Sequence, residues 1–119
     1  MRYLMLVCVE RSANAGADGV GRVISDAPDD VDVEDWVDEM DGRGIRLLGE
    51  RIRPGSDSTT VRVRDDKVLV TDGPYAETKD VIAGFDVLEC ADLDEAIQIA
   101  AKHPMSRGGV LELRPFWTD

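Results

Sequence analysis

The sequence predicts an α+β domain: a ferredoxin-like split β-α-β unit with an inserted β-hairpin. The apolar patterns follow the order strand, helix, strand, hairpin, strand, helix, strand. Only two segments have helical periodicity, enough to cover one face of a sheet. The chain's 119 residues, 43% of them hydrophobic, suit one domain covering residues 1–119.

Residues 2–9 form the first predicted strand. They are apolar at both alternating sets of positions, so both faces of this strand need to be covered. Glu10 and Arg11 end the run, and no small-residue cleavage site follows. No run approaches the roughly 20 apolar residues of a membrane span. We therefore expect a cytoplasmic protein.

A loop and a helix follow this strand. Residues 11–28 are rich in Ala, Gly and Asp and predict a long loop or lid. Val33, Trp36 and Met40 then recur at helical spacing within residues 30–42, whose first turn is acidic. Gly42 or Gly44 is expected to end this helix.

Residues 45–53 and 59–71 predict three strands, because an Asp65-Asp66 turn splits the second segment into a hairpin. Residues 81–90 predict the next strand. Asp92 then resembles an N-cap, with Glu95 three positions later, for a helix over residues 93–102.

The second helix and the last strand complete the sequence pattern. The buried stripe of this helix is expected to include Leu93, Ala96, Ile97 and Ala100. Residues 109–114 predict the last strand. With both helices on one face, the apolar second face of the sheet needs a partner, and a second copy related by two-fold symmetry is the simplest one.

Composition excludes several classes of function. A formal net charge of -11 repels phosphate backbones and anionic lipid, so nucleic acid and membranes are not expected partners. Residues 26–41 hold nine carboxylates, either as a solvated helix or as a docking surface. Cys8 and Cys90 are too far apart in sequence for a metal or redox pair, and we expect reduced core thiols and no metal or cofactor.

The densest group of polar residues lies in residues 70–79, which join two predicted strands. Tyr75, Glu77 and Lys79 are the predicted ligand-binding residues. The alternative is a structural turn, in which Gly73 and Pro74 shape the backbone and the charges are solvated.

His103 and Asp72 are the predicted catalytic residues. His103 is the sole histidine, and its ordinary pKa near neutrality suits a general acid or base oriented by a carboxylate such as Asp72 or Asp86. The alternative is structural: a histidine at a helix C-terminus, before Pro104, caps carbonyls or faces solvent.

Several motifs resemble the YCII-related, DGPF-type domain family across nearly the whole chain: Asp72-Gly73-Pro74-Tyr75, residues 76–79, Gly84-Phe85 and residues 114–116. Tyr75 replaces the phenylalanine of the motif and keeps its aromatic body. The resemblance implies a ferredoxin-like protomer that pairs sheet to sheet as a dimeric α/β barrel.

The resemblance also suggests functions, by analogy. The wider superfamily includes an enzyme that removes chloride from an aromatic ring with a proposed His and Asp pair. That histidine lies early in the chain, where this sequence has none, so the pair is not transferred. Many DGPF-type genes are associated with extracytoplasmic-function sigma factors.

Two functions are therefore predicted. The first is a homodimer that binds a small organic metabolite or processes it by acid/base chemistry. The second is a non-catalytic regulatory or interaction module, linked to such a sigma factor, whose acidic helix docks on a basic protein surface.

Overall fold

The computed structural model describes residues 1–10, 21–29, 31–75 and 80–118. Four strands form an antiparallel sheet in the order β2-β5-β1-β6. They are β1 (Arg2–Glu10), β2 (Arg46–Arg51), β5 (Asp80–Glu89) and β6 (Val110–Pro115). Each helical crossover skips one strand position, as expected for a split β-α-β unit. The predicted ferredoxin-like α+β class is confirmed.

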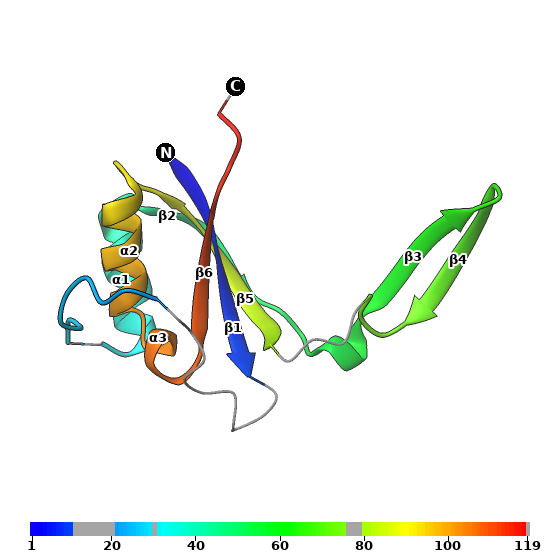
Figure 1. The fold of residues 1–119 in the computed structure, drawn as a ribbon, viewed down its shortest axis with the longest axis horizontal. Coiled ribbons are helices and arrows are strands. Elements are labelled where there is room, and N and C mark those ends of the chain that lie inside the picture. Colours follow the sequence, from blue (N-terminus) through cyan, green and yellow to red (C-terminus); the bar gives the residue numbers. More distant parts are fainter. Residues whose placement is uncertain (11–20, 30, 76–79, 119) are drawn as a thin grey trace.

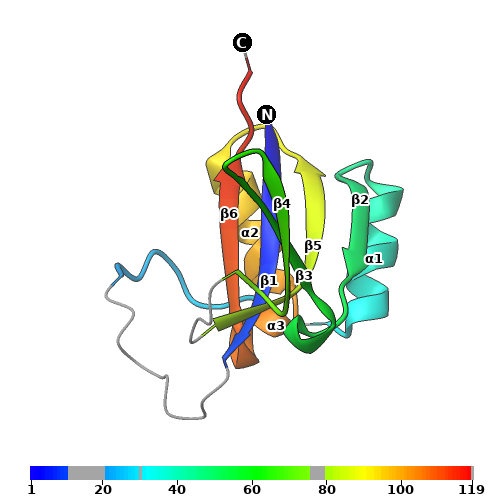
Figure 2. The same cartoon turned by 90° about the vertical axis from the view of Figure 1, so that its right-hand side faces the viewer.

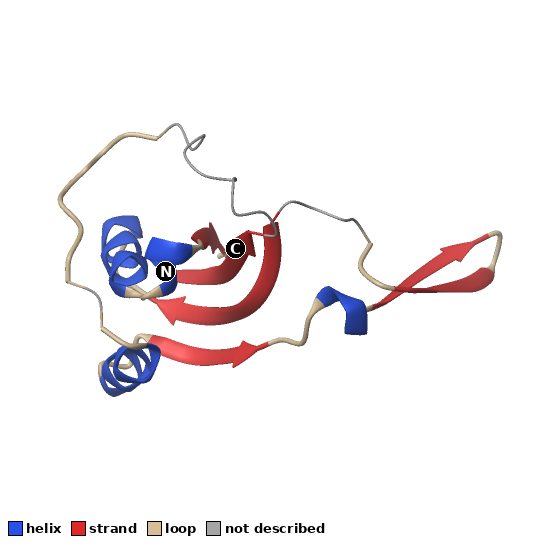
Figure 3. Cartoon of the chain, turned by 90° about the horizontal axis from the view of Figure 1, so that it is seen from below, coloured by secondary structure: helices blue, strands red, loops and turns tan. Residues whose placement is uncertain are grey.

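Helices α1 (Val33–Gly42) and α2 (Leu93–Lys102) cover one face of this sheet (Figures 1 and 3). The Trp36 indole of α1 donates a buried hydrogen bond of 3.0 Å to the Ile99 carbonyl of α2. The core between helices and sheet contains Tyr3, Met5, Val7, Trp36, Met40, Ile45, Leu88, Cys90, Ala96, Ile99 and Ala100. No helix among the described residues is long and apolar enough to span a membrane.

Both helices begin at aspartate N-caps. The Asp32 carboxylate accepts from the backbone N–H of Asp35 at 2.9 Å, and the Asp92 carboxylate accepts from that of Glu95 at 2.8 Å. The Glu95 side chain returns to the backbone N–H of Ala91 at 2.8 Å. These bonds satisfy amides that have no partner inside the helix.

Gly44 terminates α1. Its φ of +71° is left-handed, and the backbone N–H groups of Gly44 and Ile45 donate to the carbonyls of Asp41 and Met40 at 3.1 and 2.9 Å. This pair of bonds is a Schellman motif. It turns the chain so that Ile45 is buried directly before β2.

The predicted hairpin forms a separate two-stranded sheet of β3 (Thr59–Arg64) and β4 (Lys67–Asp72). Asp65 and Asp66 have positive φ values of 52° and 63°, as in a two-residue type I′ turn. A 3-10 turn, η1 (Gly55–Asp57), precedes the hairpin. We call β3, β4 and their turn the arm. It projects from the side of the main sheet that faces away from the helices (Figures 1 and 2).

Two details differ from the sequence prediction. A short helix, α3 (Met105–Gly108), lies between α2 and β6. Leu93 is 49% exposed because it lies at the solvent-facing start of α2, and Ile99, which was not predicted, is buried instead. Residues 21–29 form neither helix nor strand, and residues 11–20 of the predicted lid lie outside the described residues.

Candidate functional site

His103 lies at the junction of α2 and α3. Its backbone is extended, with φ -71° and ψ 135°, as expected before proline. The imidazole is only 4% exposed and packs edge-on against the Trp36 ring, with centroids 4.7 Å apart. Its Nδ1 accepts a hydrogen bond of 3.0 Å from the backbone N–H of Met105. The His103 side chain therefore accepts a backbone N–H at the start of α3 instead of capping carbonyls of α2, and the expectation of solvent exposure is wrong.

Burial lowers the pKa of His103, and the negative charge of Asp86 offsets this only in part. The imidazole is therefore neutral at pH 7. Because Nδ1 accepts a hydrogen bond, the single proton resides on Nε2. In this state His103 can donate a hydrogen bond, but it can accept a proton only if it releases Met105.

Asp86 belongs to a buried charged group on the helix-covered face of β5. It is 6% exposed and accepts a hydrogen bond of 2.8 Å from Nε of Arg46. Arg46 also donates to Asp41 at 3.1 Å. Burial disfavours the charge of Arg46, but the hydrogen bonds to Asp86 and Asp41 outweigh it and raise the arginine pKa.

Gly49 makes space for this ion pair. It lies opposite Asp86 in the sheet, and a Cβ at this position would lie 2.1 Å from Asp86 Oδ1 and 2.5 Å from Arg46 Nη2. The sequence analysis named Asp86 as a possible partner of His103 but did not name Arg46 or Gly49. These two residues reach Asp86 only through the pairing of β2 with β5, which the sequence analysis did not predict.

Residues 72–75, which we call the motif turn, lie at the base of the arm. Asp72 ends β4 opposite Thr59 and is exposed. Gly73 has a φ of +99°, which favours glycine. Its N–H donates to the Ser58 carbonyl at 2.8 Å, and its own carbonyl accepts from the Thr60 hydroxyl at 2.8 Å. The predicted structural role of Gly73 is therefore supported by geometry.

Tyr75 is 78% exposed, and the Arg62 guanidinium lies 5.2 Å from the centre of its ring. This is a cation–π contact on the surface. Glu77 and Lys79, the other predicted ligand-binding residues, lie outside the described residues.

The predicted site residues thus occupy two places. The arm and the helices lie on opposite sides of the main sheet (Figure 1), so Asp72 and Tyr75 are remote from His103 within one protomer. The carboxylate whose charge acts on His103 is Asp86.

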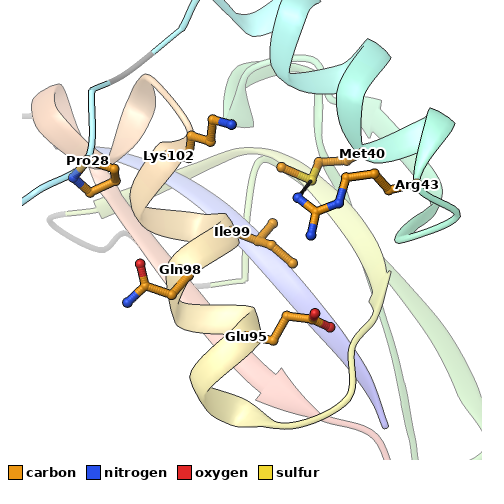
Figure 4. A pocket seen from close by; sticks show the side chains of 7 residues that line it. All are labelled: Pro28, Met40, Arg43, Glu95, Gln98, Ile99 and Lys102. Carbon is orange, nitrogen blue, oxygen red and sulfur yellow. Dashed lines mark hydrogen bonds between the residues drawn. The ribbon is translucent and has the colours of Figure 1, made fainter.

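A shallow pocket of about 230 Å³ lies between α1 and α2 (Figure 4). Met40 and Ile99 form its apolar part. Its cations, Arg43 and Lys102, both donate to Glu39, at 3.0 and 2.6 Å. These two hydrogen bonds, that from Lys102 being the stronger, lower the pKa of Glu39. Both basic side chains of the pocket are thus engaged by Glu39. The pair of Glu39 and Arg43, four positions apart on one helix, could be recognised from the sequence.

Metal-binding groups are absent from the described part of the chain: no three His, Cys, Asp or Glu side chains come close enough to hold an ion. Cys8 and Cys90 are buried and not joined in a disulfide, as predicted. Burial is the main cause of a raised pKa for Cys90, which favours the protonated thiol over the nucleophilic thiolate.

Comparison with known proteins identifies one family. The model of the YCII-related domain matches residues 35–118. An uncharacterized protein from Rhizobium meliloti (strain 1021) is 37% identical over 67 residues, which are 55% of this chain and 54% of that protein. The chain thus spans about half the length of this relative.

Proposed function

The chain belongs to the YCII-related domain family, and from that premise we propose that it is a homodimer that binds a small organic molecule beside the motif turn. The observation that carries the proposal is an apolar sheet face that no described helix covers (Figure 3). Strand register gives this open face an apolar centre and charged margins. The apolar residues are Leu4, Leu6, Cys8, Leu48, Ile82, Phe85, Val87 and Val110, and the charged ones are Glu50 on β2 and Glu112 and Arg114 on β6.

The open face has the properties of a surface that is buried on assembly. Leu6 pairs with Phe85 at its centre, and Leu4 pairs with Val87. Towards its margins, Leu48 is 53% exposed, and Ile82 and Val110 are each 44% exposed. A contiguous apolar sheet surface is costly in water, and a second copy packed sheet to sheet removes it.

The dimer is tested with a charge on the open face. Leu6→Glu adds a carboxylate at the centre of the proposed interface, so we expect a monomer at micromolar concentration in sedimentation velocity. Leu93→Glu is the control, because it makes the same change at an exposed position on the helix side. A wild-type monomer, or a dimer unaffected by Leu6→Glu, would refute the proposal.

The ligand is proposed to contact Tyr75 and Arg62. An aromatic ring that is exposed and already paired with a guanidinium offers a stacking surface beside a cation. Such a pair suits a planar molecule that carries a carboxylate. Asp72, Glu77 and Lys79 are proposed to supply the remaining polar contacts.

Thermal shift against a panel of aromatic and aliphatic carboxylates tests this site. A ligand at 100 times its dissociation constant adds about 2.7 kcal/mol to stability. Tyr75→Ala should abolish the shift and Tyr75→Phe should retain most of it. Trp117→Ala, which removes another exposed ring, should not change it. Equal effects of Tyr75→Ala and Trp117→Ala would contradict the proposed site.

A catalytic form of the proposal assigns proton transfer to His103, with Asp86 or Asp72 as the carboxylate. The buried, neutral imidazole favours ligand binding over this chemistry, because its Nδ1 is engaged by Met105. His103→Asn keeps an acceptor for that N–H but has no titratable proton. Loss of a demonstrated activity in His103→Asn, with the fold intact, would support catalysis. Unchanged activity would exclude it.

A regulatory module is the second candidate, including the link to an extracytoplasmic-function sigma factor. The observation that favours it lies on α1, where Glu34, Asp35 and Asp38 are exposed and no base in the described chain forms an ion pair with them. Binding of a basic protein surface there should weaken steeply with added salt and in Asp35→Asn/Asp38→Asn. A salt-insensitive complex would argue against it.

A further inference from the structure

The arm has two chemically different faces. Cross-strand pairing puts Val61 opposite Val70 and Val63 opposite Val68 on one side, which we call the valine face. Arg62, Arg64 and Lys67 lie on the other side with Leu69, and we call this the basic face. Tyr75 contacts Arg62 on the basic face. Among the described residues, no helix or strand packs extensively on the valine face.

All four valines are exposed in the protomer. Val61 and Val70 are each 61% exposed, Val63 is 57% and Val68 is 68%. β3 and β4 pack against each other and make no extensive contact with any other described helix or strand. A two-stranded hairpin is at best marginally stable alone in water. The arm therefore needs a surface on which to bury its valine face.

We propose that the valine face packs on a second copy of this chain, so that two protomers exchange arms across the sheet-to-sheet interface. This inference rests on the proposed homodimer. The arm and the open face both lie on the side of the main sheet away from the helices (Figures 1 and 3). The copy that covers the open face is therefore within reach of the arm.

The dimensions of the arm favour a second copy as the occupant. Strands of six residues extend about 20 Å, which exceeds the width of about 14 Å across four paired strands. Viewed from its own side, the arm passes in front of the main sheet (Figure 2). The cations of the arm, Arg62, Arg64 and Lys67, are matched in number by Asp65, Asp66 and Asp72, so the arm adds no net charge to the repulsion between two copies of a chain of net charge -11.

Two-fold symmetry would bury both pairs of apolar surfaces at once. Asp72 and Tyr75, at the base of the arm, would then lie at the edge of the interface. The ligand site would include groups from the partner, and ligand binding would depend on the dimer.

Adjacent residues on β4 provide a matched test. Val70→Lys puts a charge on the valine face, and Leu69→Lys makes the same change on the basic face; the wild-type residues are 61% and 45% exposed. Because both side chains are exposed in the protomer, both variants should fold. We expect the dimer dissociation constant, from sedimentation equilibrium of the full chain, to rise at least tenfold for Val70→Lys and less than threefold for Leu69→Lys.

The outcomes separate this inference from the proposed function. If Leu6→Glu yields monomers but Val70→Lys matches wild type or Leu69→Lys, the dimer stands and the arm exchange is wrong. If neither Leu6→Glu nor Val70→Lys affects assembly, both proposals fail. A second readout is amide hydrogen exchange of β4, which should be slower in wild type than in Val70→Lys. Equal exchange would overturn the arm contact.

Discussion

Replacing Gly49 with alanine should destabilise the protein more than any other single methyl addition at a described glycine of the main sheet. The new Cβ would lie 2.1 Å from Asp86 Oδ1, 2.5 Å from Arg46 Nη2 and 2.8 Å from Arg46 Nε. Ordinary contacts of a Cβ are 3.4 Å or longer. Asp86 lies on a central strand with 9% of its side chain exposed, so its short side chain has little room to move, and we expect its contact with Arg46 to be displaced.

Removing one partner from a buried ion pair costs about 3–5 kcal/mol. Here both charges remain, Arg46 is 18% exposed at its side chain and it keeps Asp41, which places the cost near the lower limit. Glycine to alanine also stabilises by about 0.4–1 kcal/mol through the unfolded chain. The net expectation for Gly49→Ala is a loss of about 2–3 kcal/mol.

Urea unfolding monitored by tryptophan fluorescence measures this loss as a lower midpoint. Gly42→Ala is the control, because its Cβ would have no neighbour within 4 Å and its backbone is helical. It should leave stability unchanged or raise it by up to about 1 kcal/mol. The reasoning is refuted if Gly49→Ala lies within about 1 kcal/mol of wild type, since that is less than the net cost derived from ion-pair separation.

A double variant identifies the cause of the loss. Asp86→Ala alone removes the carboxylate that the new methyl group would meet. If the clash causes the destabilisation, adding Gly49→Ala to Asp86→Ala should cost far less than adding it to wild type. Equal costs in both backgrounds would attribute the effect to the backbone of β2 instead.

Three further results are expected, all measurable by urea unfolding. The folded-state pKa of His103 is lowered, so below about pH 6.5 the unfolded chain binds a proton that the folded chain does not. Stability should therefore fall as pH drops through about 6.5, with a slope of at most about 1.4 kcal/mol per pH unit. His103→Asn should lose this slope, and an unchanged slope would contradict the assignment to His103. Trp36→Phe removes the buried donor to the Ile99 carbonyl and should lower the free energy of unfolding by about 2 kcal/mol. A loss below about 0.5 kcal/mol would mean that water replaces the indole N–H as donor. Gly44→Ala places a Cβ at φ +71° and should cost about 1 kcal/mol, with Gly44→Asn cheaper; the opposite order contradicts the Schellman geometry.

Local signals predicted the secondary structure well. The helix over residues 93–102 was predicted with the bounds that α2 has, because Asp92 and Glu95 mark its start and Pro104 follows its end. The hairpin was also predicted, since Asp65 and Asp66 tolerate the left-handed backbone of a tight turn. Both features depend on residues within a few positions of each other.

The candidate site was less predictable. His103 and the motif turn were recognised by residue type, but residue type does not tell on which side of a sheet a group lies. The imidazole is buried against Trp36, 67 positions earlier in the chain, and its electrostatic partner is Asp86 rather than Asp72. Arg46 and Gly49 were not predicted as part of the site, because their contact with Asp86 depends on the register between β2 and β5.

The amino-acid sequence was sufficient to predict the fold class, the order of the elements and the capped helix ends. It also predicted that the sheet has a second apolar face, which two helices on the first face leave uncovered. These follow from periodicity and from turn chemistry, which act over short separations. The three-dimensional structure was needed to show that the arm stands apart from the main sheet with its four valines exposed. It was also needed to show that Asp86 and Arg46 form an ion pair beside Gly49. Strand pairing and packing bring residues far apart in the chain into contact, and no local pattern encodes the register at which they meet.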